Sequence, residues 1–104
     1  MSRDLRPSEG ARYLLERTSG DMVGARATYR GVIFLPEGEH AYAVELIDDG
    51  SATLVADGAA ATAELEEGLG NLARSMARAA TRRRTEGLLP WPDRMLRWRG
   101  PGRG

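Results

Sequence analysis

The chain has 104 residues, of which 41% are hydrophobic and 29% are charged, and it contains no cysteine. This length and composition predict one globular domain with a small core, and they exclude disulfide bonds and thiolate chemistry. No apolar run approaches the roughly 20 residues of a membrane-spanning helix, and the first residues lack the apolar segment of a secretory signal. We therefore expect a cytoplasmic protein with no membrane span.

The formal net charge is zero, but the charges are segregated along the chain. Residues 31–70 carry nine acids and no arginine, a charge of −9, whereas residues 71–104 carry nine arginines and two acids, a charge of +7. Residues 1–30 carry six arginines and four acids, a charge of +2, so the three parts sum to zero. Such segregation predicts that the acidic segment 37–67 meets the arginine-rich segment 74–99, within one subunit or between subunits.

Alternation of apolar and polar side chains predicts four strands in the first half of the chain. After a flexible leader at residues 1–10, we expect strands at residues 11–18, 22–35, 40–47 and 51–56, joined by short turns as an antiparallel meander. Gly31 interrupts the second strand where the apolar pattern changes, which predicts a bulge or a bend.

The two faces of this meander differ in character. One face collects Tyr13, Leu15, Tyr29, Val44 and Leu46, and we expect a helix to cover it. The opposite face is charged and carries no predicted aromatic ring. Its arginines are Arg12, Arg26 and Arg30.

A long helix is predicted over residues 59–86, where Leu65, Leu69, Leu72 and Met76 recur at spacings of three and four. Acids near its start and arginines near its end suit the helix dipole. Gly68 and Gly70 each cost roughly 1 kcal/mol relative to alanine inside a helix, which predicts a kink or the close approach of another backbone. Gly87 followed by Leu88 is typical of a helix C-terminus.

After the long helix, Pro92 is positioned to begin a short tail helix that would place Trp91, Met95 and Trp98 on one side. Residues 100–104 are expected to form a flexible tail. The predicted fold class is therefore α+β: a four-stranded antiparallel β-meander, one long helix and a tail helix, in a single domain over residues 11–99.

No constellation of residues predicts catalysis, a cofactor or a metal site. His40 is the one histidine and lies beside Glu39 at a predicted turn, without an orienting partner. Asp48 and Asp49 are adjacent acids without the further ligands of a calcium loop. Neither a phosphate-binding P-loop nor a dinucleotide fingerprint occurs. We expect a protein that is not an enzyme.

The candidate partner-binding residues combine arginine with tryptophan. Arg74, Arg78 and Arg82 step by four along the helix and either bind phosphates or complete the helix dipole and pair with the acidic segment. The tail tryptophans either anchor a protein interface, stack on bases, lie at a membrane surface or close the core. The predicted partner-binding set is Arg74, Arg78, Arg82, Trp91, Arg94 and Trp98.

Three functions remain open from the sequence. The leading hypothesis is a small non-enzymatic protein-interaction module that self-associates as a homodimer or larger, through the long helix and the Trp/Arg tail, with another protein as a further partner. A helix over residues 59–86 would be about 40 Å long and would overhang a sheet about 15–20 Å wide, which favours a symmetric partner. The alternatives are a single-stranded nucleic-acid binder using Arg12, Arg26, Arg30 and the helical arginines, and a small-ligand binder or enzyme with a pocket between sheet and helix.

Overall fold

The computed structural model describes residues 7–19 and 24–99. Its elements in chain order are β1 (Ala11–Ser19), β2 (Arg26–Leu35), β3 (Gly38–Ile47), β4 (Ser51–Asp57), α1 (Ala63–Thr85) and β5 (Arg94–Arg99). The predicted α+β class is confirmed, and the predicted tail at 100–104 lies outside the described residues. So does most of the predicted leader, of which residues 7–10 are described and Pro7 is buried.

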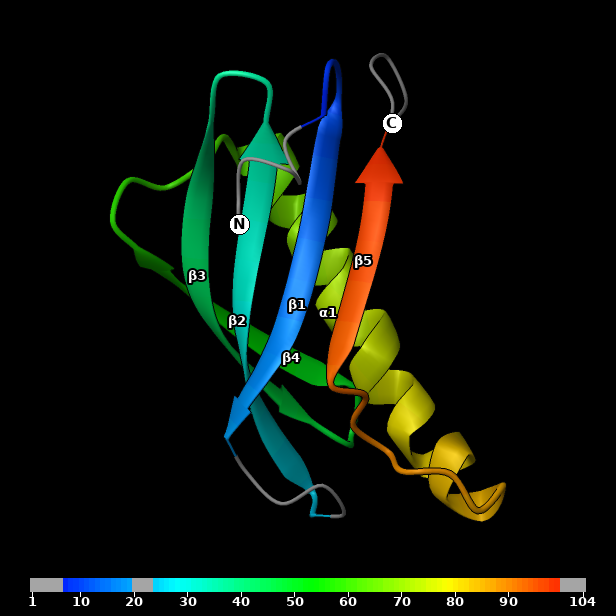
Figure 1. Ribbon diagram of the computed structural model, residues 1–104. Helices are drawn as coiled ribbons and strands as arrows, with labels where there is room; N and C mark the ends of the chain where they lie inside the picture. Colours follow the sequence, from blue (N-terminus) through cyan, green and yellow to red (C-terminus); the bar gives the residue numbers. More distant parts are fainter. Residues whose placement is uncertain (1–6, 20–23, 100–104) are drawn as a thin grey trace.

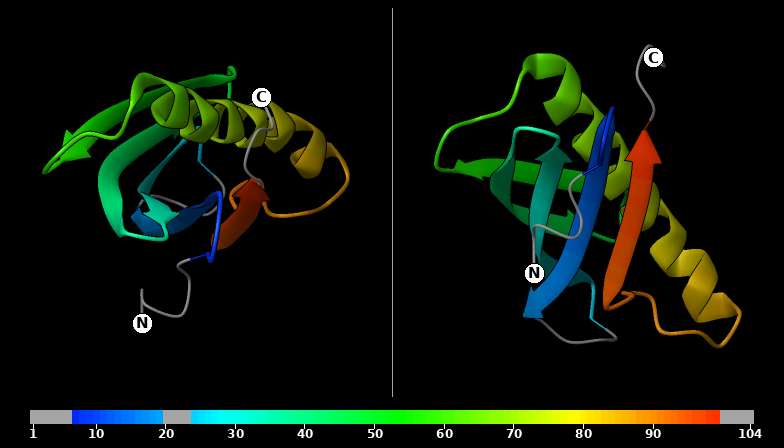
Figure 2. Two further views of the ribbon diagram at one scale, coloured as in Figure 1. Left: turned by 90° about the horizontal axis from the view of Figure 1, so that it is seen from above. Right: turned by 45° about the horizontal axis from the view of Figure 1, so that its top comes forward.

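The five strands form one antiparallel sheet in the order β4-β3-β2-β1-β5. Strands β1 to β4 make the meander that the alternating pattern predicts. The sheet is strongly curved, and α1 lies across its concave side (Figures 1 and 2). We call the side toward α1 the inner face and the convex side the outer face.

The tail forms a strand and not the predicted helix. β5 pairs with β1 over its full length, from Ala11 opposite Arg99 to Glu16 opposite Arg94. Trp91 therefore does not share a side with Met95 and Trp98: Trp91 is buried in the core, Met95 packs at the inner face and Trp98 is 54% exposed. Six residues are too few for their spacing to distinguish a helix from a strand, and the backbone groups that β1 offers on its second side favour a strand.

The core lies between α1 and the inner face, as predicted. Tyr13, Leu15, Tyr29, Val44 and Leu46 are all buried in one cluster. From α1 the same cluster receives Leu69, Ala73, Met76, Ala77 and Ala80.

Alanines dominate that helix face, because the curved sheet comes close to α1. Leu72, which the spacing placed on the buried side of the helix, is only partly buried at the edge of this core.

Of the bulge or bend predicted at Gly31, the bulge is absent. Gly31 keeps regular pairing with Leu15 on one side and Tyr42 on the other. A Cβ there would lie 3.1 Å from Leu69 Cδ2 and 3.0 Å from Val44 Cγ2. Gly31 therefore provides the space into which Leu69 of α1 packs against the sheet.

The change of apolar pattern after Gly31 has a different cause. Ile33 faces the inner core, whereas Val32 and Phe34 join Leu14 in a second buried cluster. Alternation along β1 and β2 places this second cluster on the outer face, and Leu96 of β5 packs against it. The sheet is thus apolar on both sides at its centre, which explains the uninterrupted apolar run from Val32 to Leu35.

α1 has 23 residues and is shorter at both ends than predicted. The Thr62 side chain accepts a hydrogen bond from the Leu65 N–H at 3.3 Å, and Gly87 takes a positive φ of 81° just after the last turn. Because Met76 and Trp91 are in the core and β5 widens the sheet, the expected overhang is reduced to Leu88 and Leu89, which are half exposed. Within the described residues, no helix has the length and apolar character needed to span a membrane.

The two helix glycines predict opposite responses to alanine. A Cβ at Gly68 would lie 2.7 Å from Tyr13 Cζ, so the rigid ring or the helix must move, whereas a Cβ at Gly70 meets only the flexible end of Arg74, at 3.2 Å. We expect Gly68→Ala to lower the free energy of unfolding by about 1–3 kcal/mol. Gly70→Ala is expected to be neutral or to raise it by up to about 1 kcal/mol.

Urea denaturation of both variants measures this difference directly. Equal effects of the two alanines would contradict the close approach of Tyr13 to Gly68.

Candidate interaction surface

A single stripe of α1 carries charges of both signs, and its middle members border β4. Its members recur at spacings of three and four: Glu64, Glu67, Asn71, Arg74, Arg78 and Arg82. We call this set the charged stripe. The stripe is acidic at its start and basic in its second half. The charge segregation along the chain is therefore also present on this one helix face.

The contacts of the charged stripe place it beside β4. Arg74 and Glu67 line an open groove of about 320 Å³ together with Ala52 and Leu54 of β4. Further along, the aliphatic part of Arg78 lies on Gly50 in the turn between β3 and β4. α1 therefore runs antiparallel to β4, with its basic half at the start of the strand.

Only part of the predicted pairing between the acidic and arginine-rich segments is made within one chain. Arg74 Nη2 lies 3.3 Å from Glu67 Oε2, and Arg84 Nη1 lies 2.9 Å from Asp48 Oδ2. Glu64, Arg78 and Arg82 are exposed members of the stripe. The surface beside β4 therefore keeps an acidic and a basic end that face solvent.

The predicted alternative face, with Arg12, Arg26 and Arg30, is the outer face of the sheet. Contrary to the sequence-based expectation, this face carries rings: Phe34, which is buried, and Trp98, which the tail strand brings opposite Arg12. The indole N–H of Trp98 donates to the Glu9 carbonyl oxygen at 3.3 Å. Trp98 was missed because β5 was not recognised as a strand, and Phe34 was missed because β2 carries apolar side chains on both faces after Gly31.

Most arginines of the outer face lie near acids on other strands of the sheet. Arg26 lies 3.4 Å from Glu45, Arg30 lies 3.8 Å from Asp57, and Arg94 lies 3.8 Å from Glu16. All of these side chains are largely exposed, so each pair contributes little to stability. Their effect is to make the local charge of the outer face nearly balanced.

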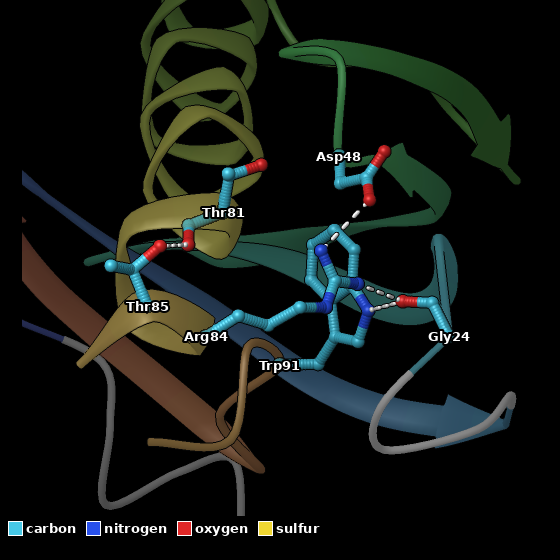
Figure 3. A network of polar contacts seen from close by, with 6 residues as sticks. All are labelled: Gly24, Asp48, Thr81, Arg84, Thr85 and Trp91. Atoms are coloured by element: carbon cyan, nitrogen blue, oxygen red, sulfur yellow. Dashed lines mark hydrogen bonds and ion pairs between the residues drawn. The ribbon is translucent and has the colours of Figure 1, made fainter. Parts of the chain in front are cut away.

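Trp91 is not on the surface. It closes the core, which is one of the roles that the sequence left open for the tail tryptophans. Its side chain is 1% exposed, and its indole N–H donates to the Gly24 carbonyl oxygen at 2.7 Å. Arg84 Nη2 donates to the same oxygen at 2.6 Å while Nη1 contacts Asp48. Figure 3 shows the Arg84 and Trp91 side chains converging on Gly24. The carbonyl oxygen of Gly24 can accept both hydrogen bonds because it has two lone pairs.

The segment between α1 and β5 is held against the end of the sheet by further contacts. Tyr29 donates its hydroxyl hydrogen to the Pro92 carbonyl oxygen at 2.6 Å. The Arg17 backbone N–H donates to the Asp93 carbonyl oxygen at 2.9 Å, and their side chains form an ion pair. These contacts hold the chain in position to enter β5, and no local sequence signal predicts them.

Burial changes the ionisation of two core tyrosines. It raises the pKa of Tyr29 to about 12, and it also raises the pKa of Tyr42. Tyr42 accepts a hydrogen bond from the Ala61 N–H at 2.9 Å and donates to Glu66 Oε2 at 2.8 Å, which ties the start of α1 to β3. Both tyrosines therefore hold elements together as neutral hydroxyl groups.

The residues considered for chemistry have structural partners. A ring nitrogen of His40 lies 3.0 Å from the Ala59 carbonyl oxygen, and Asp48 is paired with Arg84. Asp49 accepts hydrogen bonds from the Ser51 side chain and backbone in the β3–β4 turn, which lower its pKa. Among residues 7–19 and 24–99, no cluster of three or more His, Cys, Asp or Glu side chains is arranged to hold a metal ion.

Comparison with known proteins identifies no relative: no family model, no curated protein and no solved structure matches the chain.

Arg84 should contribute more to stability than the exposed Arg97. Arg84→Met keeps the aliphatic stem but leaves Asp48 without its ion pair and removes one donor to Gly24. We expect a loss of about 1–3 kcal/mol in the free energy of unfolding. Arg97→Met, at an exposed position of β5 outside the charged stripe, is the control and should change it by less than about 0.5 kcal/mol. Similar losses in both variants would show that the contacts of Arg84 with Asp48 and Gly24 add nothing beyond those of an exposed arginine.

Alkaline pH should destabilise the protein through Tyr29. Its pKa is about 12 in the folded state and about 10 in the unfolded state, so the unfolded chain ionises first. The stabilisation is complete below about pH 10 and is lost as the pH rises towards 12. Tyr29→Phe should show a smaller fall in urea midpoint between pH 9 and pH 11 than the parent protein. An identical fall in both would show that Tyr29 is not protected from ionisation.

Proposed function

We propose that this protein is a small non-enzymatic interaction module that associates with a second copy of itself, with α1 at the contact. The observation that carries the proposal is the charged stripe, which is acidic at its start and basic in its second half. Two such helices placed antiparallel are complementary, because the acidic start of each meets the basic half of the other. A cytoplasmic location belongs to this proposal and agrees with a chain that has no cysteine.

The tail contributes less to this contact than the sequence suggested. Trp91 is buried, and Trp98 and Arg94 lie on the outer face, away from the charged stripe. One two-fold contact through α1 therefore uses Arg74, Arg78 and Arg82 of the predicted partner-binding set.

A second candidate function is binding of single-stranded nucleic acid on the outer face. It is supported by the exposed Trp98 ring opposite Arg12, because an aromatic ring beside arginine is suited to stacking on a base. It is weakened by the acids that pair with Arg26, Arg30 and Arg94, since their charge opposes a phosphate backbone. We therefore rank it second.

Equilibrium sedimentation tests the proposal. At micromolar concentration and about 0.1 M salt, where the screening length is about 10 Å, we expect a mass of twice 11.3 kDa. Raising the salt concentration should weaken association. Arg78→Glu should weaken it as well, because it reverses one charge of the stripe. Arg97→Glu makes the same change on exposed β5 and serves as the matched control.

A protein that stays at 11.3 kDa would refute self-association. If that monomer also binds a random oligonucleotide with a steep dependence on salt, the second candidate replaces the first. Equal weakening by Arg78→Glu and Arg97→Glu would show that net charge matters and the stripe does not.

A further inference from the structure

The two edges of the sheet differ in how they are protected. Edge strands expose unpaired backbone N–H and C=O groups, and charged side chains on the edge discourage another strand from adding there. Edge strand β5 carries Arg94, Arg97 and Arg99. Edge strand β4 carries no charged side chain from Ser51 to Ala56 and leaves Val55 60% exposed. Of the two, β4 is the edge suited to accept another strand.

The sequence of β4 complements itself when two copies run antiparallel with Leu54 at the two-fold axis. Leu54 then meets Leu54, and Ala52 meets Ala56 of the second copy. Thr53 lies opposite Val55, a pair of β-branched side chains that suits a cross-strand contact. Ser51 lies opposite Asp57, so no two like charges face each other in this register.

The same axis brings the two charged stripes into register. α1 runs antiparallel to β4, and the groove beside Ala52 and Leu54 contains Glu67 and Arg74. Pairing of the strands therefore places the acidic start of each helix next to the basic half of the other.

The geometry points to a dimer in which β4 pairs with β4 of a second copy, joining two sheets of five strands into one continuous sheet. This inference rests on the proposed self-association and names the surface that makes it. A second copy of this chain supplies both a strand that pairs with the open edge and charges opposite to those of the charged stripe beside it.

Other pairings of the same edges are less favourable. Pairing β5 with β5 would align the arginines of two copies. Pairing β4 with β5 would be a head-to-tail contact. Each added copy would then leave one β4 edge and one β5 edge open. Such an assembly would grow as a fibre unless it closed into a ring. The two-fold pairing of β4 leaves only the arginine-protected edges exposed.

Two double variants at the same positions test the register. Thr53 and Val55 are exposed on the outer face, so both variants should keep the fold. In Thr53→Lys/Val55→Lys the proposed dimer places lysine opposite lysine at two points, and we expect the dimer to dissociate on the order of tenfold more readily or worse. In Thr53→Lys/Val55→Glu each lysine faces a glutamate, so dimerisation should be kept or strengthened.

The measurement is the dissociation constant of each variant by sedimentation, with thermal melting as the check on folding. A parent protein that dimerises while both double variants dimerise equally well overturns the β4 contact and leaves self-association standing. Weakening of both to the same extent overturns the register centred on Leu54. A monomeric parent protein overturns the proposed function itself.

Discussion

The close packing of α1 into the concave side of the sheet is the constraint on which the other features depend. It requires Gly31 in β2, where Leu69 occupies the space of a side chain, and Gly68 in α1, where the Tyr13 ring occupies it. Small residues such as Ala73 and Ala77 complete the contact. Because the helix packs so close to the sheet, the charged stripe lies beside β4.

The end of the helix is held by a different kind of interaction. Arg84 and Trp91 both donate to the Gly24 carbonyl oxygen, so the turn after α1 is attached to the sheet before the chain enters β5. β5 then covers one side of β1 with an arginine-rich strand. The sheet is left with one protected edge and one open edge, and the segregated charges of the chain lie on the side of the open one.

The sequence predicts the elements whose side chains repeat regularly. The inner face from Tyr13 to Leu46 and the helix around Leu69 follow from periods of two and of three to four, which burial on one side imposes. The tail was predicted as a helix because Arg94–Arg99 is too short for its apolar spacing to distinguish a helix from a strand. The strand with which it pairs, β1, lies far away in the sequence. The hydrogen bonds from Arg84 and Trp91 to the Gly24 carbonyl oxygen could not be predicted, because every residue has a backbone carbonyl and the sequence does not show which one a distant side chain will meet. The charged stripe could be anticipated from Arg74, Arg78 and Arg82, but its position beside β4 could not.

Amide hydrogen exchange at the two sheet edges tests whether β4 is the strand through which two copies associate. Exchange is compared at protein concentrations below and above the association midpoint, for peptides that cover 51–57 and 94–99. If β4 pairs with β4 of a second copy, amides of β4 exchange more slowly as the protein associates, while amides of β5 exchange at the same rate at both concentrations. Protection that appears in β5 and not in β4 would contradict this pairing.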